Sequence, residues 1–276
     1  MRQILHISDV HFGPPHLPEV ASAVLDLVAR RQPDLVVVSG DLTQRAKTEQ
    51  FRQAREFVDR VQAPTITVPG NHDVPMYRFW ERLLDPLGAY RRHFAAELEP
   101  EIEDDELLVL SVNTAFNWTV KGGRIRTARL GQIQRRLAAA PDHLVKIIVA
   151  HHELVPAPRF GSRRVMVNAH QAVDVFRRGG VELVLSGHLH QAWISSSEAY
   201  YPSGRRPVLL VHSGTSTSNR GRGCERQRNT CNWIRIDDDE IRVSHLGWEG
   251  TEGRFLEWSQ HRFPRRRRQP YGLEAV

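Results

Sequence analysis

The stretch VLSGHLHQA, residues 184–192, is an apolar run that ends in Gly187 and two histidines, His188 and His190. A short apolar run followed by glycine is typical of a buried strand, so both imidazoles stand just beyond its carboxyl end. The leucine between them, Leu189, is predicted to point into the core. A single histidine after a strand is commonly a structural residue whose ring is hydrogen-bonded within the protein, but two at this spacing indicate metal ligands. The other ligands are therefore expected at the ends of other strands.

Four other predicted strands also end in polar side chains. Short β-branched runs place these strands at residues 4–8, 35–39, 65–68 and 146–150. The residues that follow them are Asp9 and His11, Gly40-Asp41, Gly70-Asn71-His72-Asp73, and His151-His152. Ligand sites of open α/β sheets lie outside the carboxyl ends of the strands, so the five junctions together predict one shared site.

The donor types predict which metals this site takes. Imidazole and carboxylate together suit Mn, Fe or Zn, with Co and Ni as further candidates, rather than Ca or Mg, which prefer oxygen ligands. There are more candidate ligands than one ion needs. Two ions about 3.5–4 Å apart share a bridging carboxylate, and Asp41 is the predicted bridge because it can present one oxygen to each ion.

In this order the motifs resemble the calcineurin-like metallophosphoesterase superfamily, and the resemblance spans residues 9–190. It implies an α/β fold, a four-layer αββα sandwich of two mixed sheets, with the dinuclear site between loops at one end. It also implies that His72 faces the scissile phosphate. The implied ligands are Asp9, His11, Asp41 and His190 for the first metal, and Asp41, Asn71, His151 and His188 for the second.

Other segments narrow the resemblance. NHDVPMY (71–77), VNTA (112–115) and GHLH (187–190) are similar to bacterial class III cyclic-nucleotide phosphodiesterases and related phosphodiesterases. The chain lacks the Gly-Asp-x-Val-Asp-Arg-Gly motif of serine/threonine protein phosphatases, and it has His72 where a lipid A-pathway diphosphatase would have arginine. One departure is Glu153, which replaces the usual proline after the histidine pair and is expected to add charge at the mouth of the site.

The resemblance implies a metal-dependent phosphodiesterase acting on small, cyclic-nucleotide-like phosphodiesters. A metal-bridging hydroxide would attack phosphorus in line, and His72 would stabilise the developing charge or protonate the leaving oxygen. Asp73 is expected to orient His72 through a hydrogen bond. A nuclease acting on DNA or RNA with the same metals is the alternative, and the complete ligand set argues against a non-catalytic scaffold.

Three polar residues near the motifs are candidate substrate-binding residues: Asn113, His152 and His212. Each has a plainer alternative. Asn113 is equally typical of a turn, and His212 is a candidate structural histidine. His152 could bind substrate or brace a ligand, and it is equally expected on an exposed loop where it does neither.

The remaining pattern predicts helices near residues 17–28, 51–61, 129–139 and 169–178, and a broken helical segment at 78–96. In the broken segment, helical spacing predicts that Tyr77, Phe79 and Trp80 pack in the core. Strand candidates follow one another at 191–196, 208–213, 232–237 and 240–246, which predicts two packed sheets. The expected organisation is one domain over 1–262 and a basic tail over 263–276.

The composition is that of an ordinary globular protein, with 40% hydrophobic and 25% charged residues among 276. Much of the net charge of +6 comes from Arg262 and Arg265–Arg268. No apolar run reaches the roughly 18 residues of a membrane span, and the N-terminus does not read as a signal peptide. Cys224 and Cys231 are expected to be free thiols. We therefore expect a cytoplasmic protein with no membrane partner, and a homo-oligomer is compatible with the sequence.

Overall fold

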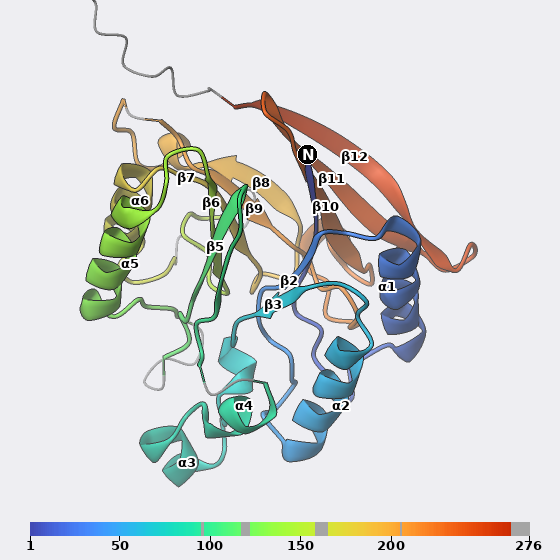
Figure 1. Cartoon of the computed structure of the whole chain (residues 1–276). Helices are drawn as coiled ribbons and strands as arrows, with labels where there is room; N and C mark the ends of the chain where they lie inside the picture. Colours follow the sequence, from blue (N-terminus) through green and yellow to red (C-terminus); the bar gives the residue numbers. More distant parts are fainter. Residues whose placement is uncertain (95–96, 117–121, 158–164, 205, 266–276) are drawn as a thin grey trace, which may run out of the picture.

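Two six-stranded sheets pack face to face in the computed structural model, which describes residues 1–94, 97–116, 122–157, 165–204 and 206–265 (Figure 1). The first sheet has the order β12-β11-β10-β1-β2-β3 and the second has the order β4-β5-β6-β7-β9-β8. The strands of the first sheet are β1 (Arg2–Ile7), β2 (Leu35–Val38), β3 (Thr65–Thr67), β10 (Thr230–Ile236), β11 (Glu240–Glu249) and β12 (Arg254–Pro264). Those of the second are β4 (Glu101–Glu103), β5 (Leu107–Val112), β6 (Val145–Ala150), β7 (Val181–Ser186), β8 (Trp193–Ser196) and β9 (Leu209–His212).

Both sheets are mixed, and their parallel parts carry the motifs. In the first sheet β1, β2 and β3 are parallel, whereas β10, β11 and β12 follow as antiparallel neighbours. In the second sheet β5, β6, β7 and β9 are parallel, and β4 and β8 pair antiparallel at the edges. The carboxyl ends of β1, β2, β3, β6 and β7 therefore deliver their loops to one end of the sandwich.

Alternating side chains build the layers. In β2, Leu35 and Val37 face the second sheet, while Val36 and Val38 face the helices. In β6, Ile147 joins the same inter-sheet cluster and Ile148 joins the helix side of the second sheet. Strands that are apolar on both faces belong to sheets covered on both faces, as here. The expected four-layer αββα sandwich is confirmed.

Helices cover the outer face of each sheet (Figure 1). The first sheet carries α1 (Pro18–Arg31) and α2 (Thr48–Asp59), and the second carries α5 (Thr127–Ala139) and α6 (Ala169–Arg178). Proline at the first position of α1 suits a helix start because its missing N–H has no partner there. Short 3₁₀ turns lie at Asn71–Asp73, Ser197–Ala199 and Gly223–Glu225. None of the described helices is long and apolar enough to cross a membrane.

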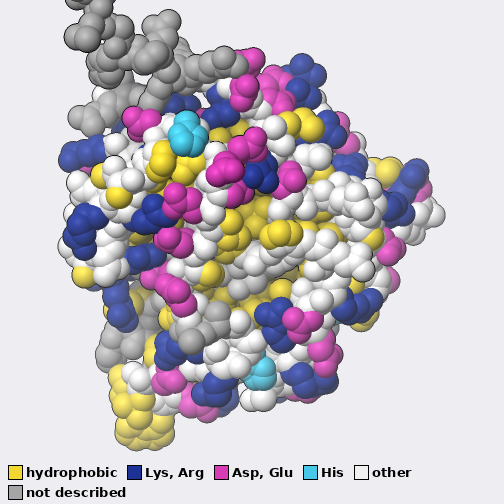
Figure 2. Space-filling model, in the orientation of Figure 1, with side chains coloured by type: hydrophobic (Ala, Val, Ile, Leu, Met, Phe, Trp, Pro, Cys, Tyr) yellow, Lys and Arg dark blue, Asp and Glu magenta, His cyan; other side chains and the backbone are white. Residues whose placement is uncertain are grey.

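The segment after β3 forms two short helices, α3 (Phe79–Leu84) and α4 (Gly88–His93), divided by Pro86. The predicted core packing of the aromatic residues here is wrong: Tyr77, Phe79 and Trp80 are 79, 63 and 70% exposed. No side chain of α3 is buried, because the helix extends from the domain at one end of the sandwich. Figure 2 shows the resulting apolar cluster over α3.

The C-terminal boundary differs from the expected one. Residues 254–264 form β12, an edge strand paired with β11, so Phe263 and Pro264 belong to the sheet and not to a tail. Arg265, the next residue, ties the end of β12 to the second sheet through a two-pronged ion pair to Glu182 of β7, with nitrogen–oxygen distances of 2.9 and 3.0 Å. Residues 266–276, the rest of the predicted tail, lie outside the described residues.

Candidate metal centre

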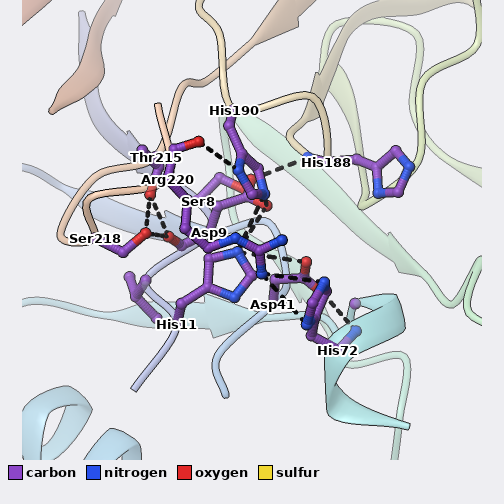
Figure 3. Close-up of polar contacts among 12 residues, drawn as sticks. Ser8, Asp9, His11, Asp41, His72, His188, His190, Thr215, Ser218 and Arg220 are labelled. Carbon is purple, nitrogen blue, oxygen red and sulfur yellow. Dashed lines mark hydrogen bonds and ion pairs between the residues drawn. The ribbon is translucent and has the colours of Figure 1, made fainter. Parts of the chain in front are cut away.

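The first group of candidate ligands joins the loops after β1, β2 and β7. Asp9, His11, Asp41 and His190 are buried and offer ligand atoms within 4.8 Å of one another. His190 Nε2 lies 3.1 Å from Asp9 Oδ1 and 3.1 Å from His11 Nε2 (Figure 3). Two sequence-predicted motifs almost 180 residues apart thus meet in one cluster, and the structure brings together the four residues of the predicted first set.

The second group forms around His151, which follows β6. Its Nε2 lies 3.2 Å from Asn71 Oδ1, 3.3 Å from His188 Nδ1 and 3.3 Å from Asp41 Oδ1. Asn71 comes from the loop after β3 and His188 from the loop after β7. The predicted second set is therefore brought together as well.

Asp41 stands between the two groups. Its Oδ1 faces His151, whereas its Oδ2 lies 3.7 Å from His11 Nε2. Asp41 is 1% exposed, and the backbone N–H of His72 donates to Oδ1 at 2.8 Å, which fixes the carboxylate. Each oxygen thus points to a different cluster, the arrangement that a bridging carboxylate requires.

Hydrogen bonds on the far side of the rings set their orientation. Nδ1 of His151 lies 2.8 Å from the Ser39 carbonyl, and Nδ1 of His190 lies 2.9 Å from the Arg220 carbonyl. A carbonyl oxygen only accepts, so each Nδ1 carries a proton, and in the neutral ring Nε2 then presents a lone pair to the cluster. This is the state in which imidazole binds a metal.

The backbone at these positions is strained in a way that serves the cluster. Eight non-glycine residues in the described chain have positive φ, and five of them are predicted ligands: Asp9, His11, Asp41, His188 and His190. Such conformations cost energy and gather at functional sites. Gly40, at φ +100°, precedes Asp41, and a Cβ there would lie 2.5 Å from His151 Nδ1. Glycine is thus required for the close approach of the two loops.

The electrostatics suit a cation. Burial alone would raise the pKa of Asp9, but His190 and His11 hold it well below its usual range. Burial lowers the pKa of His11 to about 4 and that of His188 to about 3, so both rings are neutral at neutral pH. His151 is the exception, because the Asp41 carboxylate raises its pKa to about 10 despite burial.

Two carboxylate oxygens in the clusters are buried and have no hydrogen-bond partner among the described residues: Asp9 Oδ1 and Asp41 Oδ2. A buried charged oxygen without a partner is costly, and a metal ion at this position would satisfy it. Imidazole nitrogens, carboxylates and the Asn71 amide are the donor set of first-row transition metals, and a cation in the site would take the place of the extra proton on His151. The residues therefore fit a pair of such ions.

His72 and Asp73 do not interact as expected. Nδ1 of His72 donates to the Gln44 carbonyl at 2.9 Å. The Asp73 carboxylate instead accepts from the backbone N–H groups of Leu42, Thr43 and Gly70, at 3.1, 2.8 and 2.9 Å. The predicted hydrogen bond from His72 to Asp73 is wrong, because the carboxylate is turned toward the loop after β2. Asp73 ties the Asp41 loop to the Asn71 loop.

Of the candidate substrate-binding residues, His152 lies beside the candidate metal ligands. His152 is 1% exposed, so its expected exposed position is wrong, and it lies with His151 and His188 in one cluster of ring nitrogens. Its Nδ1 contacts the Thr114 hydroxyl at 2.8 Å.

The side chains of Asn113 and His212 both contact the protein itself. Asn113 Oδ1 accepts from the Ala115 N–H at 2.9 Å, so the side chain closes its own turn. His212 is 1% exposed and stacks on Trp193 at 3.7 Å, with Nδ1 2.8 Å from the Ser186 hydroxyl. These contacts are those of the plainer alternatives, a turn for Asn113 and packing for His212, and the substrate-binding assignment of both residues stays a prediction.

Glu153 is buried rather than placed at the mouth of the site. It is 6% exposed, and its Oε2 lies 4.0 Å from His188 Nε2, the nitrogen that faces away from His151. Burial raises the pKa of Glu153 to about 7.

Sequence reasoning missed Arg220, whose guanidinium lies against His72 in Figure 3. It belongs to a polar loop in a chain with many arginines, and nothing in its local pattern distinguishes it from Arg222 or Arg226. Its place follows from the packing of the loop before β10 on the loop after β1, a contact between distant parts of the chain.

Comparison with known families decides the classification. The sequence model of the calcineurin-like phosphoesterase family matches residues 2–192, which include every candidate ligand. The chain belongs to this family.

Relatives of this calcineurin-like phosphoesterase carry phosphodiesterase names. A probable cyclic nucleotide phosphodiesterase of Synechococcus sp. is 28% identical over 176 residues, 63% of this chain and 64% of that protein. The 3',5'-cyclic adenosine monophosphate phosphodiesterase CpdA of Escherichia coli K12 is 26% identical over 68% of this chain and 70% of its own length. A cAMP/cGMP dual specificity phosphodiesterase of Mycobacterium tuberculosis is 26% identical over 94% of this chain and 84% of its own. The chain thus spans just under two thirds of the Synechococcus protein.

Solved structures share the fold. The purple acid phosphatase PPD1 of yellow lupin superposes with a TM-score of 0.73 at 12% identity, covering 95% of this chain and 53% of that one. A dimetal phosphatase of Danio rerio gives 0.62 at 12% identity, over 93% of this chain and 98% of that one. At such identities the likeness concerns the fold alone.

Proposed function

We propose that this protein is a metal-dependent phosphodiesterase that hydrolyses small phosphodiesters, with cyclic nucleotides as the favoured class. The observation that carries the proposal is the position of Asp41, which presents one carboxylate oxygen to each of two adjoining ligand clusters. The preference for diesters over monoesters, and for cyclic nucleotides among diesters, is supported by the names of the Synechococcus, Escherichia coli and Mycobacterium tuberculosis relatives.

Two transition-metal ions in this site, Mn, Fe or Zn by the donor set, would generate a nucleophile from water at neutral pH and draw charge from the phosphoryl oxygens. The chain supplies the rest. Asp9, His11 and His190 would hold one ion, Asn71, His151 and His188 the other, and Asp41 both. His72 is half-buried beside Asp41, with Nδ1 fixed on the Gln44 carbonyl and Nε2 3.2 Å from Arg220 Nη1. Nε2 is the nitrogen that would donate to a phosphoryl or leaving oxygen once it carries a proton.

Small substrates are favoured over nucleic acid because of where two arginines of the predicted basic tail lie. Arg265 is engaged by Glu182, and Arg262 stands on the edge strand β12 opposite Arg242. Neither forms a basic groove with the ligand clusters. We retain a cytoplasmic location in the proposal because Cys224 and Cys231 are unpaired, as cysteines are in a reducing compartment.

A substrate panel on one metal-defined preparation tests the proposal. The full chain is stripped of metal, reconstituted separately with Mn, Zn or Fe, and assayed on cyclic AMP, bis(4-nitrophenyl) phosphate, 4-nitrophenyl phosphate and a single-stranded oligonucleotide. We expect turnover of the two small diesters, lost on chelation. Turnover confined to the monoester would contradict the proposal, and preferential cleavage of the oligonucleotide would favour a nuclease.

A further inference from the structure

Arg220 places a guanidinium at the edge of the metal clusters. Its Nη1 lies 2.8 Å from Gln44 Oε1 and 3.2 Å from His72 Nε2, and the side chain is half-buried. The Gln44 carbonyl also holds the other ring nitrogen of His72. Gln44, in the loop after β2, thus fixes Arg220 and His72 as a pair. Figure 3 shows these two side chains next to each other.

The backbone holds Arg220 as firmly as its side chain does. Its carbonyl accepts from Nδ1 of the candidate ligand His190 at 2.9 Å, and the N–H of Arg222 donates to the His190 carbonyl at 3.1 Å. At the start of the same loop, the Thr215 hydroxyl donates to the Asp9 carbonyl at 2.7 Å. The loop is therefore built onto the first cluster, and the cation has a defined place beside it.

The charge of Arg220 is not taken up by an ion pair. In the described ranges no carboxylate oxygen lies within ion-pair distance of the guanidinium, and its hydrogen bonds there all use Nη1. A guanidinium presents five N–H donors in a planar fork that matches two oxygens of a phosphate. Nε and Nη2 thus have donors to offer a ligand.

We propose that Arg220 binds a non-bridging phosphoryl oxygen of the substrate, next to the oxygen that faces His72. This inference rests on the proposed function and deepens it, because it assigns a phosphate-binding residue outside the metal ligands. Donors that are already in place when charge develops on the phosphoryl group stabilise the transition state without reorganisation. Arginine serves this better than lysine because its fork can hold two contacts at once.

Three variants test the assignment: Arg220→Gln, Arg220→Lys and, as a matched control, Arg226→Gln, which removes an exposed arginine from the same loop. We expect Arg220→Gln to lower kcat/KM for bis(4-nitrophenyl) phosphate roughly 10- to 100-fold, the loss typical of a charged hydrogen bond. Arg220→Lys should recover part of this loss, and Arg226→Gln should match the wild type. Metal content should stay at the wild-type value in all three, because His190 is held by the backbone of residue 220.

Calorimetric titration with inorganic phosphate gives a readout independent of turnover. Its affinity for the metal-loaded protein should fall in Arg220→Gln and not in Arg226→Gln. Equal phosphate affinity and equal kcat/KM in these two variants would overturn the inference, as would loss of metal in Arg220→Gln, which would make the side chain structural. If the wild type hydrolyses no phosphate ester, the proposed function fails, whereas the phosphate titration still decides the role of Arg220.

Discussion

The ring of His72 has different contacts from the rings of the candidate ligand histidines. It lies beside Asn71 in sequence, yet its ring is turned toward Gln44 and Arg220, and only its backbone N–H contacts Asp41. Burial lowers the pKa of His72, although the Asp41 carboxylate opposes this. Its ring contributes no atom to either ligand cluster, so it is positioned to act on the substrate.

We therefore expect His72→Ala to keep its metal and to lose activity. The rate should fall by roughly 10²–10⁴, the range typical of one positioned proton-transfer group. Metal analysis and steady-state kinetics on the same preparation measure both quantities. A variant that loses a metal ion would show that His72 belongs to the ligand set.

The leaving group separates two roles of His72. If its ring protonates the leaving oxygen, the loss in His72→Ala should be smaller with nitrophenolate, a good leaving group, than with an alkyl alcohol. Equal losses for the two diesters would assign His72 to stabilisation of charge on the phosphoryl oxygens instead.

The strand-to-loop junctions are the elements that could be predicted best. Strands such as β2 and β6 are apolar on both faces and end in Gly40-Asp41 and His151-His152, so their type and their polar ends follow from local pattern. The partner of Asp73 could not be predicted in the same way. Its carboxylate is adjacent to His72 in sequence but finds the N–H groups of the loop after β2, and this choice depends on how two loops meet in space.

Three neighbouring strands of the first sheet share a ladder of polar side chains, of which two are buried and the third, His245, is half-buried. His6 on β1 stands opposite Asn232 on β10, which in turn stands opposite His245 on β11. Asn232 Nδ2 lies 3.2 Å from His6 Nδ1, and Asn232 Oδ1 lies 2.7 Å from His245 Nδ1. Burial lowers the pKa of His6 to about 3 and that of His245 to about 4, so both are neutral in the folded state.

This ladder predicts a loss of stability in mild acid. A histidine whose pKa is lowered on folding takes up its proton only in the unfolded chain, so stability is full above about pH 6.5 and falls toward the folded pKa. The variant His245→Gln keeps a donor for Asn232. As the pH is lowered, its free energy of unfolding should fall less steeply than that of the wild type, by up to about 1.4 kcal/mol per pH unit. Urea unfolding of both proteins at about pH 7 and about pH 5 measures this difference. Identical pH dependence would contradict it.

Across the whole molecule, the order of strand and helix patterns predicted two packed sheets and the family resemblance implied the four layers, whereas neither predicted the edge strand β12 or the exposed helix α3. β12 is exposed along most of its length, so its sequence carries no apolar alternation from which a strand could be recognised. The aromatic residues of α3 follow helical spacing, but that spacing cannot tell a helix packed on the core from one that extends away from it. The bridging role of Asp41 was inferred from the chemistry of two metal ions. The structure places together the five strand ends that carry the candidate ligands.

Removal of the C-terminal residues distinguishes a phosphodiesterase of small substrates from a nuclease. Because β12 and Arg265 belong to the fold, the cut is made after Arg265, which removes Arg266–Arg268 and the residues that follow. We expect kcat/KM for bis(4-nitrophenyl) phosphate to change less than about threefold, since distant surface charge is screened. If three arginines contacted duplex phosphates, the log–log salt slope would flatten by about 2.7 units on truncation. Such flattening, with selective loss of oligonucleotide hydrolysis, would favour the nuclease.

The most direct test of the dinuclear centre is the number of metal ions bound per chain, measured by plasma mass spectrometry on the wild type and on Asp41→Asn. Both clusters share the Asp41 carboxylate, which offsets the repulsion between two cations, and an amide supplies no such charge. We predict two ions per wild-type chain and loss of metal from both positions in Asp41→Asn, with activity lost as well. Two ions retained in Asp41→Asn, or a fully active wild type with one ion, would contradict the account.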